Sequence, residues 1–395
     1  MFKRFHYFLW ITLVLALVFS YSVIGQSETT KPENVYRIVY EIRHNEWYVK
    51  QAELWKKEIE KNPKNTKAWY NYYNANRYAR YTETIDTKEK QARLKKIIED
   101  MGEAIPGTYE YFLLKYWNTF NVTDVSLIEK AYQLEPKRVD TYYGFISHYE
   151  FVGKEKEMKE FCEKLYESKD IAPGLINYNY NVLMSCENDA ILFTNGDNDT
   201  YPPWMLQKAL GIREDVTVLN IPISTRTKKS YLERKLKDKK ISINFNELPD
   251  LMDKNFLQEL CKSMAVKYPD IPIYFALTVN EYFTKALTDD LYIVGLAYQY
   301  SPERIDNLAL LKKNLENNLR LDYLKYDWYD QSYLAKDIIA TMNTNYIAPM
   351  IMLAEHYKTS GEDDRAEEWK GMALALAFKS GKKGLTEEIE KKFPD

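Results

Sequence analysis

Histidine and cysteine are scarce in this chain, which has four histidines and three cysteines among 395 residues. They are His6, His44, His148 and His356, and Cys162, Cys186 and Cys261. The histidines are too scattered for zinc ligation or for a cysteine–histidine catalytic pair. The cysteines form no CxxC pair and no even framework, so we expect free buried thiols, with a single disulfide as the alternative.

An excess of charge of one sign is also missing, because the formal net charge is only −3. A chain without a strongly basic character gives no reason to expect a nucleic acid or an anionic membrane surface as its partner. Hydrophobic residues make up 45% of the chain and charged residues 29%, which is ordinary for a folded protein. The length is sufficient for two or three domains.

Long apolar runs are confined to the N-terminus. Lys3 and Arg4 precede a 13-residue apolar run, "YFLWITLVLALVF", and a short polar stretch that ends at Gly25. This order is typical of a secretory signal, so we expect residues 1–25 to be cleaved and the protein to be periplasmic, with no membrane span left. The alternative is an uncleaved inner-membrane anchor, since about 20 apolar residues can cross a bilayer.

Apolar residues at three- and four-residue spacing predict helical arms on both sides of a central region. We expect a helical arm at 26–185, an α/β domain at 186–302 and a second helical arm at 303–395. The C-terminal arm matches the tetratricopeptide frame at six positions: Leu353, Ala354, Tyr357, Gly361, Ala366 and Ala373. A generic helical hairpin is the alternative interpretation of these matches.

The central region changes period. Its short apolar runs are "AILFTN", "VTVLNI", "ISINF", "IPIYFAL" and "LYIVGLA", and helical stretches separate most of them. Continuous apolar strands that alternate with helices predict a mostly parallel sheet covered on both faces. The expected fold class is therefore α/β and α, with a mostly parallel sheet domain flanked by tetratricopeptide-like helical hairpins.

The first predicted strand ends in an acidic turn, "NGDNDTYPPW". Ligands bind at the carboxyl ends of the strands in open parallel sheets, so polar residues there are candidates for a ligand-binding rim. The candidate ligand-binding residues are Asn195, Asp197, Asp199, Thr200, Asn220 and Arg226. Carboxylates at this rim suit a hard cation, and amides and hydroxyls suit a polyol such as a glycan.

Two interpretations of this turn compete. In the first, Asp199 or Thr200 caps the next helix, two prolines fill its first turn and Gly196 makes the tight turn. In the second, Asp197 and Asp199 hold a divalent cation, as the Asp-x-Asp of many nucleotide-sugar transferases does. We expect no resident cofactor apart from such a cation. An EF-hand is excluded, because its twelfth position would be Lys208 rather than glutamate.

The segment "DAILFTNGDNDTYPPWMLQKALGIREDVTVLNI" resembles the soluble C-terminal region of a family of bacterial multi-spanning membrane proteins. Those proteins are related to the protein O-mannosyltransferases and are largely uncharacterised. The shared motif falls on Leu192 to Thr200, Tyr201, Pro202, Trp204, Gly211, Arg213, Asp215, Val216 and Asn220. The similarity covers roughly residues 186 to 375 and implies an α/β region closed by a helical repeat.

Two departures limit what this resemblance implies about activity. No further apolar stretch of spanning length follows residue 25, so nothing here corresponds to the membrane-embedded transferase portion. After Asn220 the family continues with Asn-Thr and then Trp-Tyr, whereas this chain reads "PISTRTKKSYL". Glycosyl transfer therefore does not carry over from the family.

The sequence as a whole favours an exported interaction or scaffold protein over an enzyme. Helical repeats stack into concave surfaces that bind peptides, so the expected partner is a protein of the cell envelope, with a glycan as a second ligand class. The alternative is a metal-dependent enzyme that acts on a sugar or phosphate substrate through Asp197 and Asp199.

The signal prediction has a direct test. Cleavage after Gly25 leaves Gln26 as the first residue of the exported protein. N-terminal sequencing of the protein recovered from the periplasm should therefore begin at Gln26. Recovery of an intact Met1 in the membrane fraction would instead establish the anchored form.

Overall fold

The computed structural model describes residues 30–80, 87–227, 229–326 and 332–393. Its contacts divide the chain into two compact units, of which the first ends at Asp170 and the second begins at Ile171. The predicted signal at 1–25 lies outside the described residues. Within them, no helix combines the length and the apolar character needed to cross a bilayer.

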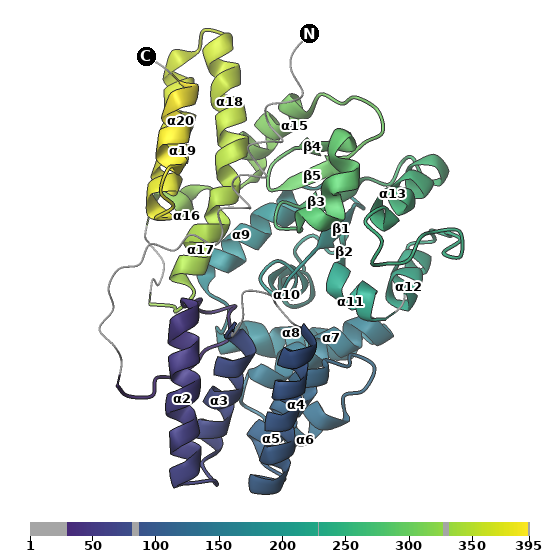
Figure 1. The fold of residues 1–395 in the computed structure, drawn as a ribbon. Coiled ribbons are helices and arrows are strands. Elements are labelled where there is room, and N and C mark those ends of the chain that lie inside the picture. The colour runs from purple at the N-terminus through teal and green to yellow at the C-terminus, as the bar shows by residue number, and fades with distance from the viewer. Residues whose placement is uncertain (1–29, 81–86, 228, 327–331, 394–395) are drawn as a thin grey trace. The chain divides into compact units, whose positions relative to one another are not determined.

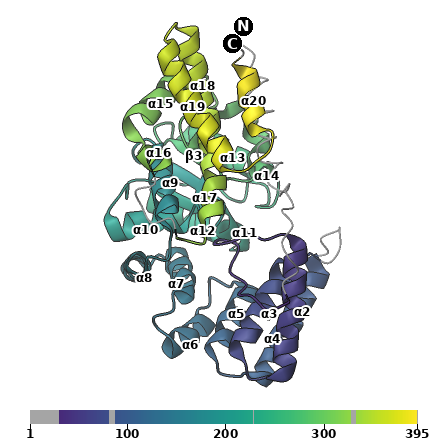
Figure 2. The ribbon, with the colours of Figure 1, turned by 90° about the vertical axis from the view of Figure 1, so that its left-hand side faces the viewer.

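The first unit is an array of helices in which sequence neighbours pack as hairpins (Figure 2). Its helices are α2 (Asn45–Lys61), α3 (Thr66–Tyr78), α4 (Thr87–Ala104), α5 (Tyr109–Thr119), α6 (Ser126–Leu134), α7 (Asp140–Val152) and α8 (Glu155–Ser168). Side-chain caps begin several of them: Asn65, for example, accepts a hydrogen bond from the Ala68 N–H. Buried aromatic and aliphatic side chains of α2 to α5 form a continuous core.

The second unit contains a five-stranded sheet with the order β2-β1-β3-β5-β4. The strands are β1 (Ile191–Thr194), β2 (Thr217–Asn220), β3 (Ile273–Ala276), β4 (Leu291–Ile293) and β5 (Ala297–Tyr300). Every residue of β1, β2 and β3 is buried, which requires cover on both faces of these strands. The expected α/β and α class is confirmed.

The sheet is mixed rather than mostly parallel. Strand β1 pairs in parallel with β2 and β3, but β5 is antiparallel to both β3 and β4. The apolar run "LYIVGLA" was expected to be one strand, and it breaks at Gly295 instead. This residue has a φ of 152°, and a Cβ there would lie 2.5 Å from the Ser185 hydroxyl oxygen. The chain turns back at this glycine and forms the β4–β5 hairpin.

One expected strand is absent from the described residues. The run "ISINF" (241–245) buries Ile241 and Phe245, so its alternation does reflect burial of one side. No strand pairs with it; the Ser242 N–H instead donates to the Tyr268 hydroxyl at 2.8 Å. Residues 241–245 therefore alternate in burial as a strand does, but no neighbouring strand forms backbone hydrogen bonds with them.

Helices precede, connect and follow the strands (Figure 1). The α-helices are α9 (Pro173–Met184), α10 (Tyr201–Leu210), α11 (Ile221–Arg226), α12 (Ser230–Asp238), α13 (Phe256–Lys267), α14 (Glu281–Thr284), α15 (Asn307–Lys313), α16 (Asp322–Lys325), α17 (Lys336–Asn343), α18 (Ile347–Thr359), α19 (Asp363–Lys379) and α20 (Leu385–Lys392). Two 3₁₀ segments, η2 (Lys285–Asp290) and η4 (Thr344–Tyr346), and a π segment, η3 (Asn314–Asn318), complete the unit. Helix α9, which the sequence placed in the N-terminal arm, belongs to this unit.

Helices α18 and α19 form a hairpin at the positions where the C-terminal frame was read. Of the six matched residues, five are buried: Leu353, Ala354, Tyr357, Ala366 and Ala373. Gly361 lies in the connection with a φ of 81°, in the left-handed region that glycine tolerates.

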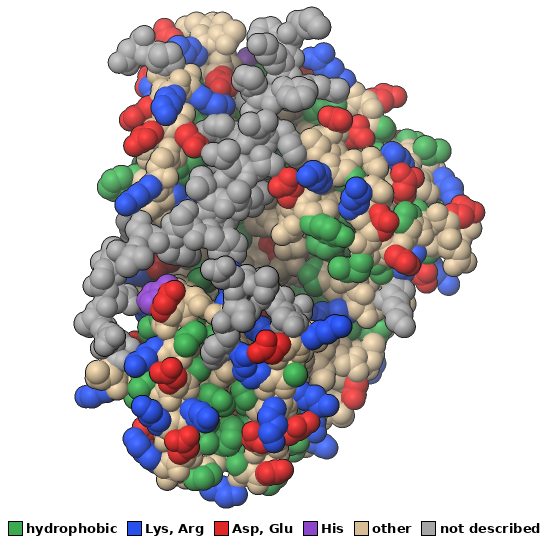
Figure 3. Space-filling view, in the orientation of Figure 1, with side chains coloured by type: hydrophobic (Ala, Val, Ile, Leu, Met, Phe, Trp, Pro, Cys, Tyr) green, Lys and Arg blue, Asp and Glu red, His purple; other side chains and the backbone are tan. Residues whose placement is uncertain are grey.

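Lys/Arg and Asp/Glu side chains are interspersed on the face shown in Figure 3, in keeping with the small net charge.

The α18–α19 contact can be tested at Ala366, which is 3% exposed. Ala366→Leu should overpack the helix pair and lower the free energy of unfolding by about 1–3 kcal/mol. Gly371→Ala on the same helix is the control, because a Cβ there meets nothing within 4 Å. It should stabilise by about 0.5–1 kcal/mol through helix propensity. Denaturant unfolding measures both, and an unchanged midpoint for Ala366→Leu would contradict the packing.

Candidate functional site

The acidic turn after β1 is built around the carboxylate of Asp199, which is 3% exposed. Its Oδ1 accepts the Gly196 N–H at 2.6 Å and its Oδ2 accepts the Asn195 N–H at 3.0 Å. The Thr278 hydroxyl donates to Oδ2 at 2.5 Å, and the Thr200 hydroxyl lies 3.4 Å from Oδ1. The carboxylate thus satisfies the backbone of its own turn and ties it to the end of β3.

The Thr200 hydroxyl joins the ends of β1 and β2. It lies 2.8 Å from the Thr194 hydroxyl, and the Asn220 Nδ2 donates to it at 2.9 Å. The Asn220 Oδ1 accepts the Ile223 N–H at 2.8 Å and so caps α11. All three polar side chains are buried, and each has a partner, which is the condition for placing such groups in a core.

The structure therefore brings together four of the six predicted site residues, namely Asn195, Asp199, Thr200 and Asn220. The other two are exposed: Asp197 lies at the surface of the turn, and Arg226 lies at the end of α11. The two carboxylates of the Asp-x-Asp consequently differ in environment, one buried beneath the turn and one on its surface.

The capping interpretation was wrong about how α10 begins. Thr200 is the N-cap residue but makes no side-chain cap hydrogen bond, and Asp199 bonds backward to the turn rather than forward to the helix. The two prolines do occupy the first turn, as expected. Gly196 has no positive φ, and a Cβ there would lie 3.7 Å from the nearest atom, so the turn does not require glycine.

Sequence reasoning missed three polar residues of this site. Thr194 and Thr278 lie at the ends of β1 and β3, and Asn179 lies on α9. The Asn179 Nδ2 donates to the Asn198 carbonyl at 2.7 Å, while its Oδ1 has no hydrogen-bond partner among the described residues. The position of Thr278 directly after the third apolar strand was a usable signal, since parallel strands end at one edge.

Burial sets the electrostatics of the turn. Loss of water raises the pKa of Asp199, and the hydrogen bonds from Thr278 and the turn N–H groups oppose that rise. Burial likewise raises the pKa of the thiols of Cys186 and Cys261. All three cysteines are free and buried, as expected. Among the described residues, no group of three or more His, Cys, Asp or Glu side chains is placed to hold a metal ion.

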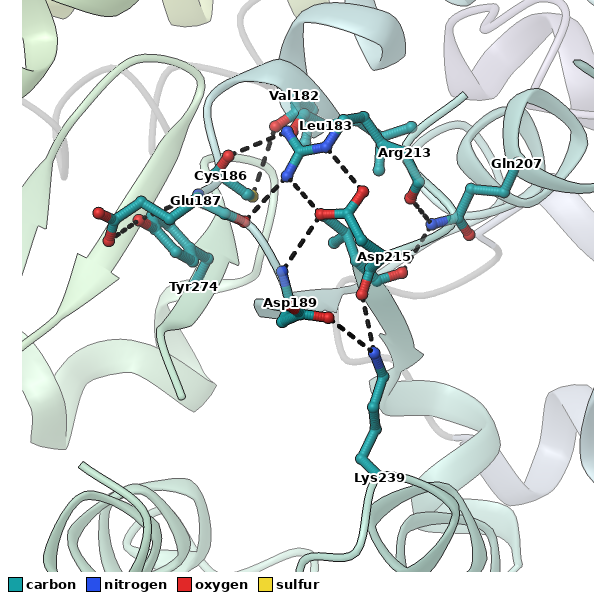
Figure 4. A network of polar contacts seen from close by, with 11 residues as sticks. Val182, Leu183, Cys186, Glu187, Asp189, Gln207, Arg213, Asp215, Lys239 and Tyr274 are labelled. Atoms are coloured by element: carbon teal, nitrogen blue, oxygen red, sulfur yellow. Dashed lines mark hydrogen bonds and ion pairs between the residues drawn. The ribbon is translucent and has the colours of Figure 1, made fainter. Parts of the chain in front are cut away.

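A second polar network lies at the opposite edge of the sheet, where β1 and β2 begin (Figure 4). Its centre is Arg213, whose Nε and Nη2 each donate to one oxygen of Asp215 at 2.9 Å. The same guanidinium donates to three carbonyl groups near the end of α9, those of Leu183, Cys186 and Glu187. A planar guanidinium can make such a set of bonds, whereas an ammonium group cannot reproduce its geometry.

The network continues from Asp215 toward β1 and α12. The Asp189 N–H donates to the Asp215 carboxylate at 3.2 Å, and Lys239 Nζ donates to the Asp215 carbonyl at 2.9 Å. Gln207 on α10 donates to the carbonyls of Arg213 and Val216, both at 2.7 Å. The Gly-x-Arg-x-Asp-Val part of the motif is thus a structural clamp on the start of β2.

Comparison with known protein families gives a match in this part of the chain. Residues 175–242 match the family model described as TMEM260-associated domain 2. The match runs from α9 to the loop after α12 and includes both the acidic turn and the Arg213 clamp. It overlaps the stretch that carries the resemblance to the membrane-protein family. No curated protein matches the chain.

The hydrogen bonds of Asp199 predict an effect of substitution that differs from that of a helix cap. Asp199→Asn turns one carboxylate oxygen into a donor, which leaves a buried N–H or hydroxyl without an acceptor. It should cost about 1–3 kcal/mol of unfolding free energy. The control is Asp197→Asn, which is exposed and should change stability by no more than about 0.5 kcal/mol. A silent Asp199→Asn in denaturant unfolding would contradict the buried arrangement.

The difference in unfolding free energy between the wild type and Asp199→Asn should also depend on pH. A raised pKa means that native Asp199 keeps its proton to a higher pH than the unfolded chain does. The stability due to this group is complete below its ordinary pKa of 3.8 and is lost as the pH rises through the folded value. The stability advantage of the wild type over Asp199→Asn should therefore shrink as the pH rises above 3.8.

Proposed function

We propose that this protein is an exported interaction or scaffold protein whose helical hairpins bind a protein partner in the cell envelope. The observation that carries this proposal is the hairpin architecture on both sides of the sheet in sequence. In the C-terminal hairpin, α18 and α19 pack against each other, and five of the six residues of the tetratricopeptide frame are buried. Stacked hairpins of this kind present extended surfaces suited to peptide segments.

The rim at Asn195–Thr200 is proposed as a secondary site for a glycan or another polar ligand. Its buried part is fixed by hydrogen bonds from three strand ends, which makes it a rigid support. Asp197 is exposed on this support and Asn195 is partly exposed. Preorganised amide and carboxylate groups of this type suit the hydroxyls of a sugar, because little side-chain freedom is lost on binding.

The alternative function is a metal-dependent enzyme that acts on a sugar or phosphate through Asp197 and Asp199. The geometry favours it less, because a cation at Asp199 must compete with the two N–H groups and the Thr278 hydroxyl that its oxygens already accept. Calorimetry with Ca²⁺, Mg²⁺ and Mn²⁺ on the wild type and on Asp197→Asn tests it. A binding heat that Asp197→Asn abolishes would favour the enzyme.

Photo-crosslinking in intact cells tests the interaction proposal. A photoreactive residue at Phe378 on α19, which is 82% exposed, samples the C-terminal hairpin, and one at Tyr166 on α8 samples the first unit. Val266 on α13, 83% exposed and outside the hairpins, is the matched control. We expect discrete protein adducts from a hairpin position and none from Val266. Equal labelling from all three positions, or none, would count against a hairpin-bound partner.

A further inference from the structure

An extended segment of the chain lies against the helical array of the first unit. Residues 32–37 form neither a helix nor a strand, yet their burial alternates along the chain. Asn34, Tyr36 and Ile38 are exposed, while Val35 between them is 1% exposed. Alternation with a period of two is how an extended peptide lies on a surface, with every second side chain directed inward.

Side chains of α2 and α3 hold this segment by its backbone. The Gln51 Oε1 accepts the Glu33 N–H at 2.7 Å, and the Trp55 indole N–H donates to the Glu33 carbonyl at 2.7 Å. Two residues further on, the Asn71 Oδ1 accepts the Val35 N–H at 2.6 Å. Contacts of this kind recognise an extended main chain whatever its side chains are, as in other modes of peptide recognition.

The next inward residue, Arg37, is surrounded by aromatic rings. Its guanidinium carbon lies 4.9 Å from the ring centre of Tyr143, 5.3 Å from that of Trp117 and 5.8 Å from that of Tyr40. The hydroxyls of Tyr40 and Tyr143 both donate to the Asp170 carboxylate, each at 2.5 Å. Rings placed in this way attract a cation through their π faces, and an arginine best uses a stacked arrangement.

The side chains that receive the segment come from four helices, of which α2 carries Gln51 and Trp55. Asn71 is on α3, Trp117 on α5 and Tyr143 on α7. These helices are neighbours, because Tyr73 on α3 donates to Asn118 on α5 at 3.0 Å, and Tyr116 on α5 donates to the Gly144 carbonyl on α7 at 3.4 Å. One face of the helical array is thus lined by side chains of α2, α3, α5 and α7, and binding surfaces of helical repeats are likewise built from several helices.

The segment leaves some buried hydrogen-bonding groups at this surface without a partner. Gln51 is fully buried, and its Nε2 has no hydrogen-bond acceptor within the part of the chain that the structure describes. One carboxylate oxygen of Glu33 is likewise buried without a donor there. An unpaired buried group disfavours the bound state, so an extended peptide that offers a carbonyl to Gln51 would bind better than this segment does.

From these contacts we propose that the face formed by Gln51, Asn71, Trp117 and Tyr143 is a peptide-binding groove, and that residues 33–37 occupy it as an intramolecular ligand. The groove takes an extended protein segment with an apolar residue and, two residues later, an arginine. The proposal rests on the interaction function above and gives the partner segment its chemistry. A partner displaces residues 33–37 when it binds.

Fluorescence polarisation tests the groove with a labelled peptide of residues 30–42, "TKPENVYRIVYEI", added to the exported protein. In Arg37→Ala the intramolecular ligand loses its anchor, so the free groove becomes more populated. The peptide should then bind at least about tenfold more tightly than to the wild type, because apparent affinity scales with the binding-competent fraction.

Arg43→Ala is the matched control, since Arg43 follows the segment and lies over Trp47 instead. It should bind the peptide as the wild type does. A second control is the peptide carrying R37E, which places a negative charge against the ring faces and should not bind Arg37→Ala. Equal affinity of the peptide for Arg37→Ala and the wild type, or no binding to a folded Arg37→Ala, would overturn the proposal.

Hydrogen exchange on the wild type keeps the test independent of whether Arg37→Ala folds. At millimolar peptide, the Glu33 and Val35 amides should exchange faster, because the added peptide replaces the bonds to Gln51 and Asn71. Unchanged exchange together with no polarisation change would reject the groove. Persistent crosslinks from Phe378 in that case would show that the interaction function stands while this assignment of its partner fails.

Discussion

The guanidinium of Arg213 is the contact on which the second unit depends. It joins three parts of the chain: the end of α9, the approach to β1 and the start of β2, which it reaches through Asp215. This side chain is 15% exposed, and Asp215 is 31% exposed. Hydrogen bonds to a charged group contribute about 1.5–3 kcal/mol each when they are well formed, and Arg213 also holds the pKa of the Asp215 carboxyl below its usual range.

Because the Arg213 network fixes where β1 and β2 begin, it also determines which residues meet at their carboxyl ends. The two strands run parallel in a four-residue register, so their carboxyl ends meet with Thr194 opposite Asn220. Thr200 fits between these two side chains, and the turn folds over the buried Asp199. The rim is thus a consequence of the clamp: if β2 moved by one residue relative to β1, the inward side chain at its end would change faces and the Asn220–Thr200 bond would be lost.

Local patterns predicted the parts of this structure that depend on local sequence. The apolar runs that end near Asn195 and Asn220 became β1 and β2. Of the polar residues predicted to meet there, Asp199, Thr200 and Asn220 are buried together, whereas Asp197 and Arg226 are exposed. The hydrogen bonds that the turn itself gives to Asp199 are local, but the bond from Thr278 comes from 79 residues away, and no local pattern carries that information. The mixed sheet depends in the same way on the approach of Gly295 to Ser185. The run at 241–245 had the right alternation but no neighbouring strand to pair with.

The two units use their polar side chains differently, and this difference bears on function. At the rim the buried amides and hydroxyls mostly bond to one another and to their own turn. They therefore hold the exposed residues of the rim in place and do not themselves contact a ligand. In the helical unit, Gln51 and Asn71 instead direct their oxygens to the main chain of a separate extended segment. A helix normally satisfies its own backbone, so amide side chains on the paired helices α2 and α3 that accept N–H groups from another segment are a means of recognition. These backbone hydrogen bonds do not depend on the sequence of the bound segment. The aromatic rings around Arg37 add selectivity for its side chain, because ring faces attract a cation and not a carboxylate.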